Sequence, residues 1–498
     1  MRHATIATRT YAVVAATAIV GLLSACAQNA STASGTASPA AAAPAVDLTK
    51  PPVLGAPKAL SLPAVVNREL PNGLKLIIVE QHELPIADFV LVIRSGAETD
   101  EPGKLGTATL ATSLLKEGTT TRNSLQIADQ EAFLGVDIFA GSGWDATTLQ
   151  LHTPTAQLDS ALALFADIAL RPAFPHNELE RLRKNRLTSL LQVKDRAPEI
   201  ANRAYAAIVF GSAAYGRPLT GDEASTNAIQ QSDIRRFYDT YFRPNNATLL
   251  IVGDVRPDDV ERRARALFGG WQRGSVPPAS YGQPPAAKGT TIYLVDKPGA
   301  AQSSFRIGTV GVPRSTADYF PLTVMNTALG GSFTSRLNQN LRETKGYTYG
   351  ASSGFSMRRA PGPFTASAEV VAAKTDSALI EFMKELRAIR DSIPQEELEK
   401  TKRYLQLQLP GSFETTGGIA AQLSQLVRYD VPLSFYNSYT QGIAAVTAAD
   451  VQRVARQYID PDRLAIVIVG DRKSIEPTLR ATKVGEVTVV DITGRPAM

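Results

Sequence analysis

Apolar positions recur along the chain with two different periods, which together predict a mixture of strands and helices. Runs rich in β-branched and aromatic residues predict strands at 74–80, 89–94, 247–252 and 464–469. Apolar stripes at helical spacing predict helices over 158–168 and 379–389. Because strands and helices interleave without a strict βαβ rhythm, we expect an α+β fold in which sheets are covered by helices.

The pattern of the first half of the chain returns in the second half. Three anchors recur in order: Phe89 with Phe305, Phe174 with Ile393 and Tyr241 with Tyr458, at offsets of 216, 219 and 217 residues (305 − 89, 393 − 174 and 458 − 241). A nearly constant offset indicates an internal duplication. We therefore expect two homologous halves, each a mainly antiparallel sheet covered by helices, at 63–273 and 291–498, with a Pro-rich linker at 274–290.

The first residues predict an exported, lipid-anchored protein. Residues 1–26 combine a basic start with an apolar run that ends in Leu-Ser-Ala-Cys26, and Cys26 is the only cysteine of the chain. Cys26 is therefore the expected lipidation site, although Ala25-Cys26-Ala27 also fits an ordinary signal-peptidase site. Residues 27–62, rich in Ala, Ser, Thr and Pro, predict a disordered tether. The expected location is the bacterial cell envelope, at the outer membrane and facing the periplasm.

Composition narrows the functional classes. The 498 residues are 44% hydrophobic and carry a net charge of only +5, without a dense Lys/Arg block. A nucleic-acid partner is therefore not expected.

Residues 106–119 carry the most informative motif, because the residues at its two ends match a known pattern and the residues between them, which would bind a metal, do not. The segment opens with Gly-Thr-Ala and closes with Gly-Thr, around a helix predicted over 105–115. It resembles the active-site helix of the pitrilysin/insulinase family of zinc peptidases, which includes mitochondrial processing peptidase. That helix carries His-x-x-Glu-His, where this chain has Thr109, Thr112 and Ser113. Zinc takes imidazole, thiolate or carboxylate ligands, so no metal or other cofactor is expected in this chain.

The other candidate ligands are also weak. The resemblance places the third zinc ligand, a Glu, near Thr188, and Asp195 and Glu199 lie further on. The histidines outside the signal segment are His82, His152 and His176, and none has a second His or Cys three or four residues away. We expect these histidines to be surface residues.

The second half contains a better match. Leu341-Arg342-Glu-Thr-Lys-Gly346-Tyr-Thr-Tyr349 resembles the Leu-Arg-Glu-x-x-Gly-x-x-Tyr signature of the same family, whose functional Arg and Tyr are seven positions apart. A charged guanidinium and a directed hydroxyl can both stabilise the oxyanion formed when a peptide bond is cleaved. The segment 139–144 resembles the edge strand on which family members lay their substrate.

The resemblance covers about residues 65–495 and implies halves that close around a peptide like a clamshell. It also implies a zinc-less subunit that pairs with a zinc-bearing homologous peptidase and supplies Arg342 and Tyr349 in trans. Such a chain would be inactive alone, with zinc held by its partner. The alternative is a non-catalytic envelope scaffold or peptide-binding lipoprotein.

Overall fold

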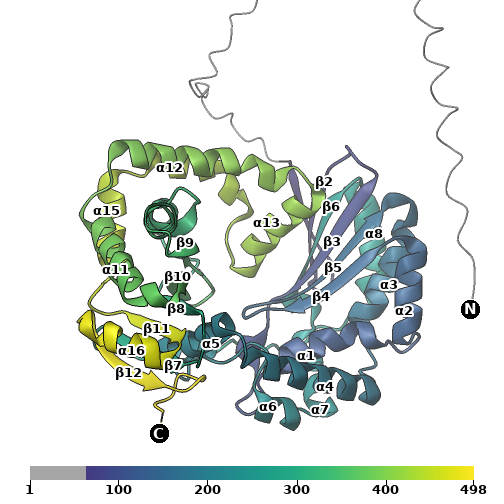
Figure 1. Ribbon diagram of the computed structural model, residues 1–498. Helices are drawn as coiled ribbons and strands as arrows, with labels where there is room; N and C mark the ends of the chain where they lie inside the picture. Colours follow the sequence, from purple (N-terminus) through teal and green to yellow (C-terminus); the bar gives the residue numbers. More distant parts are fainter. Residues whose placement is uncertain (1–62, 498) are drawn as a thin grey trace, which may run out of the picture. The chain divides into compact units, whose positions relative to one another are not determined.

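The computed structural model describes residues 63–497, which fold into two six-stranded mixed sheets with helices on their faces (Figure 1). The predicted signal segment with Cys26 and the predicted tether at 27–62 lie outside the described residues. The longer helices are α1 (Thr107–Leu114), α2 (Ser124–Leu134), α3 (Leu158–Leu170), α4 (His176–Val193), α5 (Ala197–Phe210), α6 (Glu223–Ala228), α7 (Gln231–Tyr241), α8 (Pro257–Phe268), α9 (Tyr319–Asn326), α11 (Thr375–Asp391), α12 (Gln395–Gln408), α13 (Thr416–Arg428), α14 (Tyr439–Ala445), α15 (Ala448–Tyr458) and α16 (Arg472–Ala481). Across 63–497, no helix has both the length and the apolar character needed to cross a membrane.

The first sheet belongs to the N-terminal half and is antiparallel except at one pairing. Its strand order is β1 (Val65–Glu69), β2 (Lys75–Glu80), β6 (Ala247–Gly253), β3 (Ile86–Ile93), β5 (Thr147–Pro154) and β4 (Asp137–Ser142). Only β2 and β6 run parallel. The strand β4 ends the sheet and pairs with β5 alone, so its other edge is open.

The second sheet repeats this arrangement in the C-terminal half. Its order is β12 (Glu486–Val490), β7 (Thr291–Asp296), β11 (Ala465–Gly470), β8 (Gln302–Val310), β10 (Pro363–Val371) and β9 (Thr348–Phe355). The strands β2 to β6 and β7 to β11 can each be numbered one to five along the chain. In both sheets these five strands then lie side by side in the order one, five, two, four, three. The predicted α+β duplication is therefore confirmed. The halves differ at one edge, where β1 pairs antiparallel with β2 but β12 pairs parallel with β7.

Each half buries its own apolar core on one face of its sheet. In the N-terminal half, Phe89 of β3 lies in the same cluster as Phe165 of α3 and Phe268 of α8, and all three rings are at most 1% exposed. In the C-terminal half, Phe305 of β8 stacks on Phe382 of α11 with centroids 5.8 Å apart. The helical stripes predicted at 158–168 and 379–389 are these covering helices, α3 and α11.

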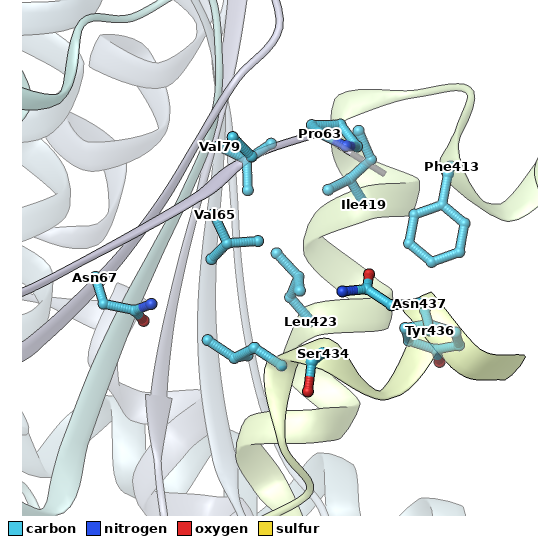
Figure 2. Close-up of a pocket in the computed structure, with 12 residues that line it drawn as sticks. Pro63, Val65, Asn67, Val79, Phe413, Ile419, Leu423, Ser434, Tyr436 and Asn437 are labelled. Atoms are coloured by element: carbon cyan, nitrogen blue, oxygen red, sulfur yellow. The ribbon is translucent and has the colours of Figure 1, made fainter. Parts of the chain in front are cut away.

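The opposite face of each sheet is covered by a helix from the other half. Helix α13 packs on β3 and β6 of the first sheet, and α5 packs on β8 and β11 of the second. Leu423 and Ile419 of α13 lie against Val79 and Val90 of the first sheet. A cavity of about 360 Å³ remains at the sheet edge beside α13, and Val65 also lines it (Figure 2). Because the exchange is reciprocal, neither half completes its core alone.

A buried polar cluster, the seam, joins the halves beside β4. It consists of Glu98, Asp145, Tyr215, Arg358 and Arg359. The Tyr215 hydroxyl donates to Asp145 Oδ1 at 2.7 Å, and the Arg359 backbone N–H donates to Asp145 Oδ2 at 3.4 Å. The Arg358 guanidinium lies over the Tyr215 ring at 4.6 Å. Charged groups from both halves thus share one desolvated site.

The predicted linker at 274–290 contains no helix or strand, but it makes specific contacts with the N-terminal half. The backbone O of Tyr281 accepts the Ala214 N–H at 2.8 Å, and the rings of Tyr281 and Tyr215 lie 5.3 Å apart. These contacts hold the connection between the halves against the seam.

Candidate functional site

Helix α1 begins at a sharp, well-capped turn. Gly106 has φ +89°, and a Cβ there would lie 2.5 Å from Thr220 O and 2.8 Å from Arg186 Nη1. The Asp100 carboxylate caps the helix from outside, because it accepts the N–H groups of Gly106 at 2.6 Å and of Ala108 at 2.9 Å. The helix expected over 105–115 exists as α1 at Thr107–Leu114, with a 3-10 turn after it; its apolar positions are buried, whereas Leu105 lies before the helix and is partly buried.

The three positions that carry metal-site residues in the resembling family are occupied by hydroxyls that bond within α1. Thr109 Oγ1 donates to Gly106 O at 3.0 Å, Thr112 Oγ1 to Ala108 O at 2.8 Å and Ser113 Oγ to Thr109 O at 2.9 Å. Such back-bonding satisfies a helical Ser or Thr locally. Thr112 is also only 1% exposed. The hydroxyls are thus used by the helix backbone.

The remaining candidates do not complete a zinc site. Thr188 is exposed and donates to Lys184 O of its own helix at 3.0 Å. Asp195 is exposed, and Glu199 forms an ion pair with Arg196 at 3.8 Å. No group of three His, Cys, Asp or Glu residues in 63–497 could hold a metal ion. The residues present therefore do not fit zinc.

Arg186 occupies the space between α4 and α1, and sequence reasoning missed this contact. Its Nη1 donates to Gly106 O at 2.8 Å, and its Nη2 donates to Thr109 Oγ1 at 3.0 Å. A guanidinium from the helix expected to bear the third ligand therefore touches the first degenerate position. The only signal in the sequence was a basic residue two positions before Thr188, in a helix with several others.

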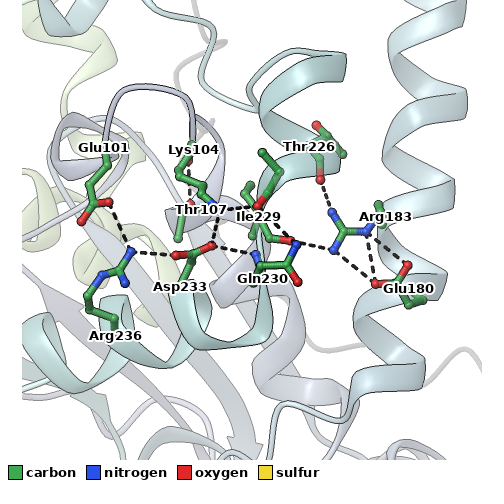
Figure 3. A network of polar contacts seen from close by, with 11 residues as sticks. Glu101, Lys104, Thr107, Glu180, Arg183, Thr226, Ile229, Gln230, Asp233 and Arg236 are labelled. Atoms are coloured by element: carbon green, nitrogen blue, oxygen red, sulfur yellow. Dashed lines mark hydrogen bonds and ion pairs between the residues drawn. The ribbon is translucent and has the colours of Figure 1, made fainter.

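A polar network holds α4 and α7 in place around this centre (Figure 3). Buried Arg183 of α4 donates to Ile229 O at 2.7 Å and to Thr226 O, which ties α4 to α6. Asp233 of α7 pairs with Lys104 at 2.7 Å, just before α1. Because Arg183 lies one turn before Arg186, these contacts fix the part of α4 from which Arg186 reaches α1.

The three histidines are surface residues, as expected. His82 is exposed, with Nδ1 2.7 Å from Asp254 and Nε2 3.1 Å from Glu80, and the bond to Asp254 is the main cause of its raised pKa. His152 is half-exposed and lies 3.0 Å from Asp88. His176 begins α4 and is exposed.

Arg342 and Tyr349 lie at the open-edge end of the second sheet, on either side of a tight turn. Arg342 belongs to a single π-helical turn at Gln339–Thr344, and Tyr349 is in β9. Gly346 makes the turn with φ +64° and donates its N–H to Arg342 O at 3.0 Å. The Arg342 guanidinium lies over the Phe333 ring at 4.7 Å and pairs with Glu343 at 3.3 Å. In residues 63–497, no hydrogen bond joins Arg342 to Tyr349, and the Arg342 guanidinium is instead held by Phe333 and Glu343.

The segment expected to be an edge strand is one. Most of it lies in β4, which ends at Ser142, so Gly143 and Trp144 follow the strand; β4 contacts α1, and Lys116 in the turn after that helix donates to Ile138 O. Phe139 is 56% exposed. An extended peptide could pair with this edge next to the degenerate centre.

Two family models match adjoining parts of the chain. The model described as "Insulinase (Peptidase family M16)" matches 75–223, and the one described as "Peptidase M16 inactive domain" matches 228–405. A zinc protease of Streptomyces coelicolor is 24% identical over 81% of the chain and 89% of that relative. One of Mycobacterium tuberculosis is 24% identical over 83% and 95%.

Solved structures agree with these matches. The peptidase M16 inactive domain from Pseudomonas fluorescens superposes with a TM-score of 0.77 and 26% identity, covering 82% of this chain and 98% of that one. A protease from Helicobacter pylori shares the fold, with a TM-score of 0.77 and 21% identity over 82% of this chain and all of that one. Both halves of the duplication thus match one family, and the chain belongs to the insulinase family of peptidases, peptidase family M16, without zinc-binding residues at positions 109, 112 and 113.

Proposed function

We propose that this chain is the zinc-less subunit of a two-chain peptidase and supplies Arg342 and Tyr349 to a zinc-bearing homologue. The proposed lack of zinc rests on the hydroxyls of α1, which cannot replace zinc ligands. The proposed role in another chain's active site rests on Arg342 and Tyr349, which this chain retains at the family's spacing. A chain without its own metal has a use for this pair only at another chain's site.

The exposure of the pair is the observation that carries the proposal. Tyr349 is 90% exposed, and the Arg342 side chain is 38% exposed. An aromatic side chain so open to solvent gains nothing from burial in this chain. A partner that covers the β9 edge would desolvate both groups and so strengthen their hydrogen bonds to a developing oxyanion.

The open edge of β4 is the proposed site for the peptide substrate. Backbone groups along an unpaired strand bind an extended chain irrespective of its side chains, and side-chain contacts add selectivity. The exposed Phe139 on this strand offers one such contact.

The location of the complex is a further part of the proposal. A lipid on Cys26 would anchor the subunit to the envelope, and residues 27–62 would hold the folded part away from the surface. The peptidase would then act on peptides of the periplasm.

The test is to assemble the chain with a zinc-bearing homologue and replace the pair. Arg342→Ala and Tyr349→Phe should each lower kcat by roughly 100- to 1,000-fold, the usual loss for one oxyanion donor. Assembly should be unchanged by size-exclusion chromatography. The matched controls are Arg387→Ala and Tyr404→Phe, whose side chains are also partly exposed but lie on α11 and α12.

The competing function is a non-catalytic scaffold or peptide-binding lipoprotein, which the open β4 edge favours. The kinetic test separates the two. If both variants keep full activity in an assembled complex, the role in trans is wrong and the scaffold interpretation stands.

A further inference from the structure

Arg186 is a guanidinium with unused donors in the place where the resembling family has a metal. It makes two hydrogen bonds, both to neutral oxygens of α1, although a guanidinium carries five N–H groups. In residues 63–497, no carboxylate oxygen lies within 4.0 Å of its nitrogens. Arg186 is partly buried, and its remaining N–H groups form no hydrogen bond to any residue in 63–497.

The charges around Arg186 leave an excess of positive charge. The carboxyl group that acts on the Arg186 charge is Asp100, which is 5% exposed and accepts hydrogen bonds from the backbone at the start of α1. Burial raises the pKa of Asp100 to about 7, so it is incompletely ionised at neutral pH. Arg217 also faces Asp100 and donates to its backbone O at 3.3 Å. Burial lowers the pKa of Arg186 to about 10, so the guanidinium remains charged.

A partly desolvated cation without an ion-pair partner is unfavourable until an anion binds it. Among anions, a carboxylate matches the planar fork of a guanidinium best, because two parallel N–H···O bonds can form. Helix α1, which Arg186 contacts, also contacts β4, so a peptide paired with the open edge of that strand would lie on the same side of the N-terminal half as this centre.

We propose that this centre has changed from a metal site into a receptor for a carboxylate carried by a peptide, with Arg186 as the binding residue. The carboxylate comes either from a free C-terminus or from an Asp or Glu side chain. This role goes beyond the proposed function in trans, because it concerns the chain's own N-terminal half and needs no partner subunit.

The experiment uses the full chain alone and a short peptide with one interior Glu, labelled at its N-terminus with dansyl, which is uncharged at neutral pH. The peptide is made with a free or an amidated C-terminus, each with Glu or with Gln at the interior position. Fluorescence anisotropy should show that the wild-type chain binds a carboxylate form about 10- to 100-fold more tightly than the doubly neutral form, the range for a hydrogen bond to a charged group. Comparing the single-carboxylate forms identifies the source of the anion.

Substitution of Arg186 assigns the effect to this residue. Arg186→Met should abolish the preference, and Arg186→Lys should keep part of it because the charge remains while the fork is lost. Arg262→Met, at an exposed arginine of α8, is the matched control and should behave as wild type. Circular dichroism checks the fold of each variant, and Arg186→Lys keeps the test decisive if Arg186→Met is unfolded.

Three results would overturn the proposal: equal affinity for charged and neutral peptides, no binding of any form, or an intact preference in a folded Arg186→Met variant. None of them bears on Arg342 and Tyr349, because the assay contains no zinc-bearing subunit. The two proposals can therefore fail separately.

Discussion

Replacing Glu98 by Gln is expected to make the stability of this protein less dependent on pH. Glu98 is 3% exposed and lies at the seam between the halves. Its Oε2 accepts the Gly96 N–H at 2.8 Å, whereas its Oε1 has no hydrogen-bond partner in residues 63–497. Burial, reinforced by repulsion from Asp145, raises the pKa of Glu98 from its ordinary 4.5 to about 8.

The direction and size of the effect follow from proton linkage. Between pH 4.5 and pH 8 the folded chain keeps a proton on Glu98 that the unfolded chain has released, so stability falls as pH rises through this window. At 1.36 kcal/mol for each pKa unit, the loss between about pH 5 and about pH 8 is roughly 3–4 kcal/mol. Gln cannot ionise, so Glu98→Gln should not lose this free energy.

Denaturant unfolding at several pH values measures the prediction. The free energy of unfolding of Glu98→Gln minus that of wild type should grow by roughly 3–4 kcal/mol from about pH 5 to about pH 8. Glu83→Gln, at an exposed position, is the matched control and should track wild type. If the plots of unfolding free energy against pH for Glu98→Gln and wild type stay parallel, Glu98 does not have a raised pKa in the folded chain, and the reasoning is wrong.

Three further predictions concern the metal site, the anchor and the helix exchange. Thr109→His, Thr112→Glu and Ser113→His together should not create a zinc peptidase, because the third ligand is missing and Arg186 fills the centre; stoichiometric zinc by elemental analysis, or strong peptide cleavage, would contradict this. Cys26→Ser should release the protein from membranes or block its processing, and unchanged fractionation and mass would count against lipidation. Leu426 of α13 is 1% exposed, so Leu426→Ala should lower the free energy of unfolding by about 3 kcal/mol. Leu407 of α12 is 47% exposed, so the control Leu407→Ala should change it by less than about 0.5 kcal/mol. Equal effects of the two variants in thermal unfolding would refute the packing of α13 on the first sheet.

The sequence predicted those features that depend on short, periodic patterns. The frame of α1, the strand β4 and the duplication could be recognised because each is written in neighbouring residues or in segments repeated at a constant offset. The loss of zinc ligands was equally visible, because a ligand set depends on residue type at fixed spacing.

The contacts that redefine the site are not periodic, and sequence reasoning missed them. Arg186 looked like one more charge on a basic helix, and nothing local shows that it reaches Thr109, 77 positions earlier (186 − 109). Ile419, Leu423 and Leu426 form an apolar stripe that predicts a buried helix face, but a stripe does not identify the sheet it packs on. Likewise, the stacking of Arg342 on Phe333 depends on how two turns meet in space.

The exchange of α5 and α13 imposes an order on the synthesis of the chain. The first sheet has all its strands once β6 ends at residue 253, but α13 begins only at residue 416, which is 163 residues later (416 − 253). At about 5–20 residues per second, a ribosome needs roughly 8–30 s to add them. During that interval the apolar face formed by Val79, Val90 and Leu250 has no partner within the nascent chain. The second sheet meets the opposite situation, because α5 is already made before its first strand emerges. Until α13 is available, the sheet of the N-terminal half either exposes this apolar face or stays unfolded, whereas the sheet of the C-terminal half can pack on α5 as soon as its strands form.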